Sequence, residues 1–192
     1  MKPGRSTFSF IIRRFSCFEI SEGKYALDRE LSELLDTLYE FGTDYDSKVK
    51  NHVERMLNIT HDTGLFLSIL IQAVRANRAL ELGTSNGSST LWIADALRNT
   101  SGKVTTVKVS EKKVSMATGN FEKSGLKSYV NSRLEDVRLF LKSQEDESFD
   151  LVFLDAERPE YTSYWRDLDR VLKQGGLLIV DNALAPRPER IG

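Results

Sequence analysis

Three side chains that offer oxygen ligands follow two apolar runs in the last third of this chain. Asp155 follows the run 149–154, and Asp181 and Asn182 follow the run 177–180. The two aspartates lie 26 positions apart, about the length of one strand–helix–strand crossover, so their side chains should emerge at one edge of a sheet. If the two strands are neighbours, these donors suit Mg²⁺ or another hard cation. The alternative is that both aspartates are turn or cap residues, which commonly follow strands.

A loop with two glycines is the second feature whose spacing suggests chemistry. An apolar run ends at Glu81, Gly83 and Gly87 follow, and a helical pattern begins at Ser88. This order is typical of the start of a nucleotide-binding α/β domain, because glycines allow close backbone approach and a helix start offers free N–H groups. The spacing Gly-x-x-x-Gly is not the dinucleotide fingerprint Gly-x-Gly-x-x-Gly, and no Gly-Lys-Ser/Thr follows. The loop therefore disfavours a dinucleotide ligand.

The composition predicts one soluble domain with a small-molecule ligand. The 192 residues suit a single domain. The 27 Lys and Arg residues nearly balance the 28 Asp and Glu residues, so no overall field favours nucleic acid or acidic lipid. The single cysteine, Cys17, cannot form an internal disulfide, which fits a reducing compartment, and no apolar run approaches the ~18 residues of a membrane span. The expected location is cytoplasmic.

The first 18 residues differ in composition from the rest. They contain Lys2, Arg5, Arg13 and Arg14, several serines and phenylalanines, and no acidic residue. This composition is typical of an organellar transit peptide, and the alternative is a loose N-terminal extension that packs where its phenylalanines find cover. The expected organisation is an extension over 1–26 and one domain over 27–192.

Helical patterns precede the glycine loop. Apolar residues at helical spacing predict a helix over 27–41, with Gly42 as its stop, and a second helix over 46–57. A third helix should begin near Thr63 as N-cap and lie buried against the sheet, because it is apolar nearly all round. His52 and His61 show no metal-ligand spacing and are expected to be surface or capping residues.

Strand and helix patterns alternate from Arg78 onward. Beside the strand ending at Glu81, the expected strands cover 104–109, 129–134, 149–154 and 177–180. The expected helices cover 111–123, 137–142 and 161–172, the last one ended by Gly175 and Gly176. Apolar strands separated by helices imply a parallel sheet covered on both faces. We therefore predict an α/β fold with a Rossmann-like, doubly wound, mostly parallel sheet of five strands.

Taken together, these segments resemble the class I S-adenosylmethionine-dependent O-methyltransferases, specifically the cation-dependent caffeoyl-CoA and catechol O-methyltransferase group. The resemblance runs from about Leu27 to Leu184. It rests on TGLFL at 63–67, LELGT at 80–84 with Gly87 and Ser89, FDLVFLDA at 149–156 and GGLLIVDN at 175–182. The cofactor-binding residues that it implies are Glu81, Gly83, Thr84, Ser85, Gly87, Ser89, Lys108, Asp136 and Asp155. The implied metal ligands are Asp155, Asp181 and Asn182, and the implied catalytic positions are Asp155 and Arg158.

The activity that the resemblance implies is methyl transfer from S-adenosyl-L-methionine to a small hydroxylated, catechol-like acceptor. With a divalent cation such as Mg²⁺ bound, two neighbouring acceptor oxygens are held and the pKa of one hydroxyl falls. The resulting phenolate, oriented toward the sulfonium methyl, attacks the methyl carbon in a single displacement.

Two positions depart from the family pattern. Lys108 stands where the family usually has an acidic residue that bonds the ribose hydroxyls, and a lysine cannot accept a hydrogen bond from a hydroxyl. Ser110 or Glu111 would have to replace that acceptor. Arg158 stands where the family commonly has a lysine, and it stays protonated, so deprotonation of the acceptor falls to the metal or to water.

The C-terminal end also differs from the family, which continues through a further helix and two strands, one of them antiparallel. Here the sequence stops at Gly192, and the strand over 177–180 would be left as an apolar edge. Such an edge is liable to pair or aggregate unless it is covered. We expect a truncated chain, or cover from the N-terminal extension or from a second subunit in a homodimer.

Two other functions stay open at this stage. A catalytically impaired methyltransferase-like protein that serves binding or assembly is favoured by Lys108, Arg158 and the early end. An NADP-dependent enzyme would use Lys108 to meet a 2′-phosphate, although the glycine spacing disfavours it.

Overall fold

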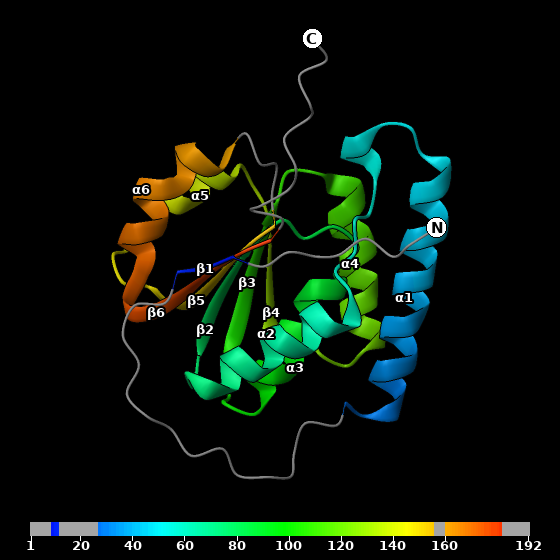
Figure 1. Cartoon of the computed structure of the whole chain (residues 1–192), viewed down its shortest axis with the longest axis horizontal. Helices are drawn as coiled ribbons and strands as arrows, with labels where there is room; N and C mark the ends of the chain where they lie inside the picture. The colour runs from blue at the N-terminus through cyan, green and yellow to red at the C-terminus, as the bar shows by residue number, and fades with distance from the viewer. Residues whose placement is uncertain (1–8, 12–26, 156–159, 182–192) are drawn as a thin grey trace.

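A twisted sheet with helices on both faces organises the chain (Figure 1). The computed structural model describes residues 9–11, 27–155 and 160–181. Within them the strand order is β1-β6-β5-β2-β3-β4. The strands are β1 (Ser9–Ile11), β2 (Arg78–Leu82), β3 (Lys103–Lys108), β4 (Val130–Leu134), β5 (Phe149–Leu154) and β6 (Leu172–Val180). The strands from β2 to β6 pair in parallel, which confirms the predicted α/β, Rossmann-like sheet.

Helices cover the two faces of this sheet unequally. The α-helices of the described residues are α1 (Arg29–Lys48), α2 (His61–Ala73), α3 (Ser88–Arg98), α4 (Glu111–Lys123), α5 (Val137–Ser143) and α6 (Tyr161–Val171). Short 3-10 turns are η1 (His52–Glu54) and η2 (Lys127–Tyr129). Figure 1 shows α5 and α6 on one side of the sheet and α2, α3 and α4 on the other, with α1 outermost. The larger layer thus contains α1 and α2, the two helices that precede the glycine loop.

The alternation of side chains along the central strands builds two cores. Leu151 and Phe153 of β5 join the core under α1, α2 and α3, whereas Val152 and Leu154 join the core under α5 and α6. Successive side chains of a strand point to opposite faces, so an apolar run of this kind is buried on both sides. This double burial keeps the ends of β5 in fixed positions.

Helix α1 continues past the glycine that was predicted to stop it. It begins after Asp28, whose carboxylate caps the amide of Leu31, and it ends at Lys48. Gly42 lies buried inside the helix, where a Cβ would stand 2.5 Å from Nδ2 of Asn58. The glycine therefore serves close packing of the next segment, and the predicted helix end at 41 is wrong.

The predicted helix over 46–57 is also wrong, because the chain turns away from helical geometry after Lys48. Both carboxylate oxygens of Asp46 accept hydrogen bonds from the amides of Met56 and Leu57, at 2.6 and 2.9 Å. Leu57 has a positive φ of 50°. These two bonds hold the segment after α1 against the last turns of that helix instead of extending it. Only the η1 turn forms within this connection.

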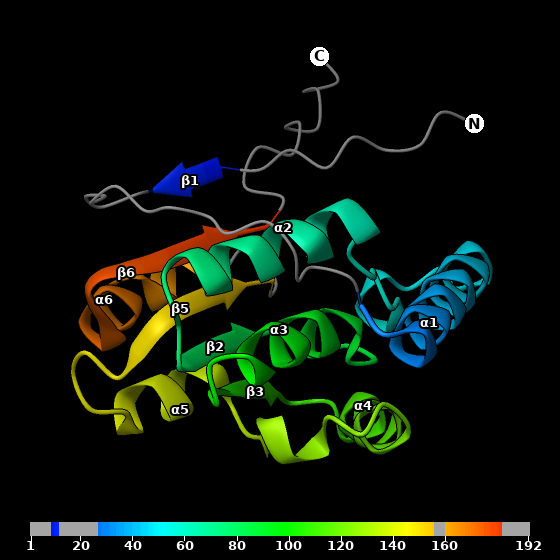
Figure 2. The same cartoon turned by 90° about the horizontal axis from the view of Figure 1, so that it is seen from below.

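Helix α2 forms where predicted but is less buried than expected. The predicted N-cap, Thr63, is wrong: Thr60 is the N-cap and its hydroxyl accepts from the amide of Thr63, which lies in the first turn. Leu67 is fully buried, while Leu65 and Ile69 are about two-fifths exposed. Figure 2 shows α2 beside α3 with α1 beyond them. Leu65 and Ile69 are therefore only partly covered by the described chain.

Strand β6 starts directly after α6, so Gly175 and Gly176 do not separate a helix from a strand as predicted. They lie inside β6, where Gly175 has a φ of 82° and the pairing with β5 is irregular near Phe149 and Leu151. Glycine tolerates this left-handed conformation, which marks a bulge.

The N-terminal segment supplies the strand beside β6. Ser9, Phe10 and Ile11 pair antiparallel with Val180, Ile179 and Leu178. Of the covers expected for the apolar edge, the structure therefore shows the N-terminal extension. Cys17 and the basic residues of the extension lie outside the described residues.

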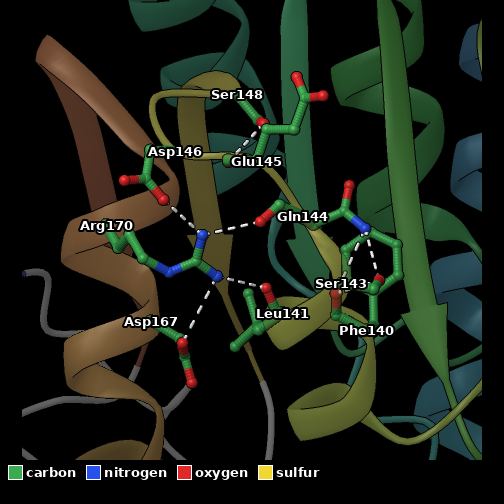
Figure 3. A network of polar contacts seen from close by, with 9 residues as sticks. All are labelled: Phe140, Leu141, Ser143, Gln144, Glu145, Asp146, Ser148, Asp167 and Arg170. Atoms are coloured by element: carbon green, nitrogen blue, oxygen red, sulfur yellow. Dashed lines mark hydrogen bonds and ion pairs between the residues drawn. The ribbon is translucent and has the colours of Figure 1, made fainter.

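Arg170 fixes the amino end of the sheet (Figure 3). Its guanidinium donates to the carbonyl oxygens of Gln144 at 2.7 Å and Leu141 at 2.8 Å, and it pairs with Asp146 at 2.7 Å and Asp167 at 3.5 Å. The arginine joins α6 to the turn that leads into β5. This contact holds the start of β5, whose opposite end carries Asp155.

Candidate functional site

The backbone ladder continues one residue beyond the strands and sets the spacing of the site. The amide of Gly83 donates to Val107 O at 3.2 Å, that of Asp155 to Leu82 O at 3.0 Å, and that of Asp181 to Leu154 O at 3.0 Å. Asp181, Asp155 and Gly83 consequently stand side by side along the carboxyl edge. The predicted neighbourhood of the two aspartates is confirmed, and β2 and β5 form the point where strand order reverses.

Glu81 is fully buried beneath this edge, where three hydroxyl groups donate hydrogen bonds to its carboxylate. Ser89 donates to one carboxylate oxygen, and Thr90 and Thr106 donate to the other, each at 2.5 Å. The hydroxyl of Thr84 contacts that of Thr106, which extends the network to the loop. Burial raises the pKa of Glu81, while the hydrogen bonds of Ser89, Thr106 and Thr90 oppose the rise. Glu81 thus joins β2, β3 and the start of α3 into one unit.

The glycine loop is shaped by contacts that leave little freedom. Gly83 and Gly87 have φ values of 125° and 90°, and a Cβ on Gly87 would lie 2.6 Å from the Phe121 ring. The Asn86 carbonyl accepts from the Asn120 side chain at 2.9 Å, and the Asn86 side chain accepts from the amide of Ser88. Gly87 occupies the N-cap position of α3, so within the described residues the Asn86 carboxamide is the side chain that meets an amide of the first turn. The loop therefore presents a helix start with a preformed backbone, the arrangement that binds anionic groups.

Charges of one sign accumulate around Asp155. Burial raises the pKa of Asp155 well above the ordinary aspartate value, and the neighbouring charges of Asp181 and Glu81 raise it further. The ammonium groups of Lys108 and Lys113 oppose this rise. Asp181 is only 7% exposed. The positive charges of the two lysines do not cancel the effects of burial and of the neighbouring carboxylates on Asp155. Asp155 and Asp181 could therefore bind a hard cation favourably.

The other residues predicted to bind the cofactor do not all lie at the carboxyl edge. Lys108 ends β3 at the same edge and is half-buried. Ser85 donates its hydroxyl to the carbonyl of Met56, outside the loop. Asp136 is exposed and caps α5 by accepting from the amides of Arg138 and Leu139. Ser110 is the N-cap of α4, and its hydroxyl oxygen accepts a hydrogen bond from the amide of Lys113.

Two predicted residues, Arg158 and Asn182, lie outside the described residues. Within the described ranges, no group of three or more His, Cys, Asp and Glu side chains is arranged to hold a metal. His52 and His61 accordingly belong to no such cluster, and His61 lies 3.5 Å from Asp36.

Sequence reasoning missed two sets of residues around the site. Thr90 and Thr106 complete the Glu81 network, and Lys113 inserts from α4 toward the connection between α1 and α2. The only sequence signal is that hydroxyl residues follow the loop and occur within an apolar strand.

None of the helices in the described ranges is both long and apolar enough to cross a bilayer.

Known proteins share this architecture. Residues 29–186 match the sequence profile of a family described as O-methyltransferase. A catechol O-methyltransferase of Niastella koreensis is 34% identical over 131 residues, which cover 67% of this chain and 59% of the relative. A catechol O-methyltransferase of Mycobacterium tuberculosis is 30% identical over 126 residues, covering 66% and 57%. The chain thus spans less than two thirds of the length of these curated relatives.

Solved structures agree with the sequence comparison. The O-methyltransferase from Bacillus cereus, determined in complex with SAH, superimposes with a TM-score of 0.64 and 27% identity, over 81% of this chain and 66% of that chain.

Proposed function

Because this chain belongs to the O-methyltransferase family, we propose that it transfers a methyl group from S-adenosyl-L-methionine to a hydroxyl of a small, catechol-like acceptor with the help of a divalent cation. The observation that supports this proposal most is the adjacency of Asp155 and Asp181 at the carboxyl edge, next to the glycine loop. A methyl donor bound at the loop would lie beside an acceptor bound at the two carboxylates. The names of the relatives agree with such an acceptor.

The cofactor would use the glycine loop and the start of α3. Gly83 and Gly87 allow the backbone to approach the methionine part of the cofactor, and Glu81 and Ser89 keep the loop in place through their mutual hydrogen bond. Thr84 and Ser85 hold the loop to β3 and to Met56. Lys108 and Asp136 would lie toward the nucleoside part. The SAH complex of the Bacillus cereus enzyme supports this choice of ligand.

Asp155, Asp181 and Asn182 would hold the cation. Their oxygen donors fit Mg²⁺, and the repulsion between the first two carboxylates is what a bound cation would relieve. When bound, the cation supplies Lewis-acid chemistry that lowers the pKa of an acceptor hydroxyl. The remaining work falls to the protein: the rigid edge would orient the acceptor oxygen toward the methyl group, and Arg158, three positions after Asp155 in the sequence, would supply positive charge.

A calorimetric titration tests this proposal. S-adenosylmethionine and S-adenosylhomocysteine should bind, with and without Mg²⁺, whereas NADP should not. Binding of NADP alone would favour the dinucleotide alternative, and absence of binding by all three would contradict the proposal.

A binding or assembly protein without catalysis is the second candidate. Lys108 favours it, because this half-buried lysine stands at the sequence position where the family usually offers an acceptor to the ribose. Such a protein would bind S-adenosylhomocysteine but would produce no methylated catechol.

A further inference from the structure

Lys113 is a buried lysine to which the proposed function gives no binding or catalytic contact, although its charge lowers the pKa of Asp155. It lies on the first turn of α4 with only 8% of its surface exposed. Its ammonium donates to the carbonyl oxygens of Val53 at 3.1 Å and Arg55 at 2.6 Å. A lysine ammonium is costly to bury without partners, and these two carbonyls are among the groups that hold it in place.

The residues that Lys113 contacts belong to a segment with little structure of its own. Residues 53–57, here called the strap, include the end of η1 and continue toward α2. Asp46 of α1 accepts from the amides of Met56 and Leu57, and Ser85 of the glycine loop donates to the carbonyl of Met56. The strap is therefore fixed from three directions, by α1, by α4 and by the loop.

These contacts link Lys113 to the glycine loop. One hydrogen bond joins Lys113 to the carbonyl of Arg55, and a second joins the next carbonyl, that of Met56, to Ser85 of the loop. Lys113 sets the position of the carbonyls at 53 and 55, and the next carbonyl, at 56, holds the hydroxyl of Ser85. Ser85 itself has a positive φ of 36°, a conformation that a non-glycine residue keeps only when its surroundings enforce it. Movement of the strap would release that constraint on the loop.

We propose that Lys113 is a positioning residue for the cofactor site, which it preorganises by holding the strap against the glycine loop. The inference rests on the proposed function, because its consequence is measured as affinity for S-adenosylhomocysteine. Loss of the ammonium leaves the sheet intact and lets the strap move. A mobile strap adds an ordering cost to ligand binding.

The test compares Lys113→Met, which removes the donors, with Lys113→Arg, which keeps them. Lys112→Met is the matched control, because Lys112 is the exposed neighbour on the same turn. Lys113→Met should weaken S-adenosylhomocysteine binding by about tenfold, as expected for the loss of hydrogen bonds to a charged group. Lys113→Arg and Lys112→Met should stay within about twofold of the unaltered protein.

Limited trypsin digestion gives a readout that needs no ligand. The bond after Arg55 lies in the strap, so its cleavage, followed by mass spectrometry, should be faster in Lys113→Met than in the two other variants. If Lys113→Met does not fold, Asp46→Ala offers the same test from the α1 side, with faster cleavage and weaker binding expected.

The outcomes separate this inference from the proposed function. Unchanged cleavage in folded Lys113→Met would contradict the anchoring role, and faster cleavage with unchanged affinity would contradict the link to the cofactor site. An equal loss of affinity in Lys112→Met would also overturn it. Failure of the unaltered protein to bind S-adenosylmethionine or S-adenosylhomocysteine would instead contradict the proposed function, and with it the ligand part of the inference.

Discussion

The buried carboxylates of Asp155 and Asp181 at the edge of the sheet lower the free energy of unfolding when both are charged. Burial and the nearby charges of Asp181 and Glu81 raise the pKa of Asp155. The folded protein therefore binds the proton of Asp155 more tightly than the unfolded chain does. The contribution of this group to stability is present at low pH and is lost as pH rises from the ordinary aspartate pKa through the raised one.

Removal of that charge should stabilise the protein at neutral pH. Asp155→Asn is expected to raise the free energy of unfolding by about 1 kcal/mol at pH 7, and the gain should shrink toward acidic pH. Thermal unfolding followed over pH measures this difference. Mg²⁺ should then raise the melting temperature of the unaltered protein more than that of the variant. A variant less stable than the unaltered protein at pH 7 would contradict the account of the site's electrostatics.

Single positions at strand ends could be predicted from the sequence, whereas contacts across the chain could not. Asp155 and Asp181 follow apolar runs, and the parallel pairing of those runs places both residues at one edge. Thr106 and Lys113 gave no such signal, because their partners lie 25 and about 60 residues away in sequence. Their roles depend on the finished packing of β3 and α4.

At the scale of the elements, local signals decided which predictions were right. The ranges of β5 and α4 agree with the sequence, since an apolar run and a Ser110 cap define them. The connection between α1 and α2 was predicted wrongly, because Asp46 caps distant amides and Gly42 serves packing. In both cases a residue with a common local role makes a tertiary contact instead.

Two glycine substitutions should separate packing from helix propensity. Gly42→Ala should lower the free energy of unfolding by about 1–3 kcal/mol, because the new Cβ meets the side chain of Asn58. Gly119→Ala, in the middle of α4, should raise it by about 0.5–1 kcal/mol, because no neighbouring atom of the described residues lies within 4 Å of the added Cβ. Denaturant unfolding compares the two variants. Equal effects would contradict the packing role assigned to Gly42.

At the scale of the whole molecule, the sheet brings together residues from both ends of the described chain. The pairing of β1 with β6 lies immediately before Asp181. An edge strand that is paired exposes fewer open hydrogen-bonding groups to other chains. The N-terminal segment thus protects the border of the candidate site.

Deletion of residues 1–26 should expose this border. Amides of Leu178, Ile179 and Val180 are expected to exchange hydrogen faster in the shortened protein, while those of the central strand β2 keep their protection. Light scattering should show self-association through the open edge. Identical exchange at β6 with and without the segment would contradict the role of β1.

The central claim, metal-assisted methyl transfer at the carboxyl edge, is tested most directly by turnover. The protein is incubated with methyl-labelled S-adenosylmethionine and catechol, and labelled methyl ether is measured with Mg²⁺ and with EDTA. We predict product with Mg²⁺, loss of product with EDTA, and loss in Asp181→Ala with the fold retained. Methyl transfer that persists in both EDTA and Asp181→Ala would contradict the claim, as would ligand binding with no product under any condition.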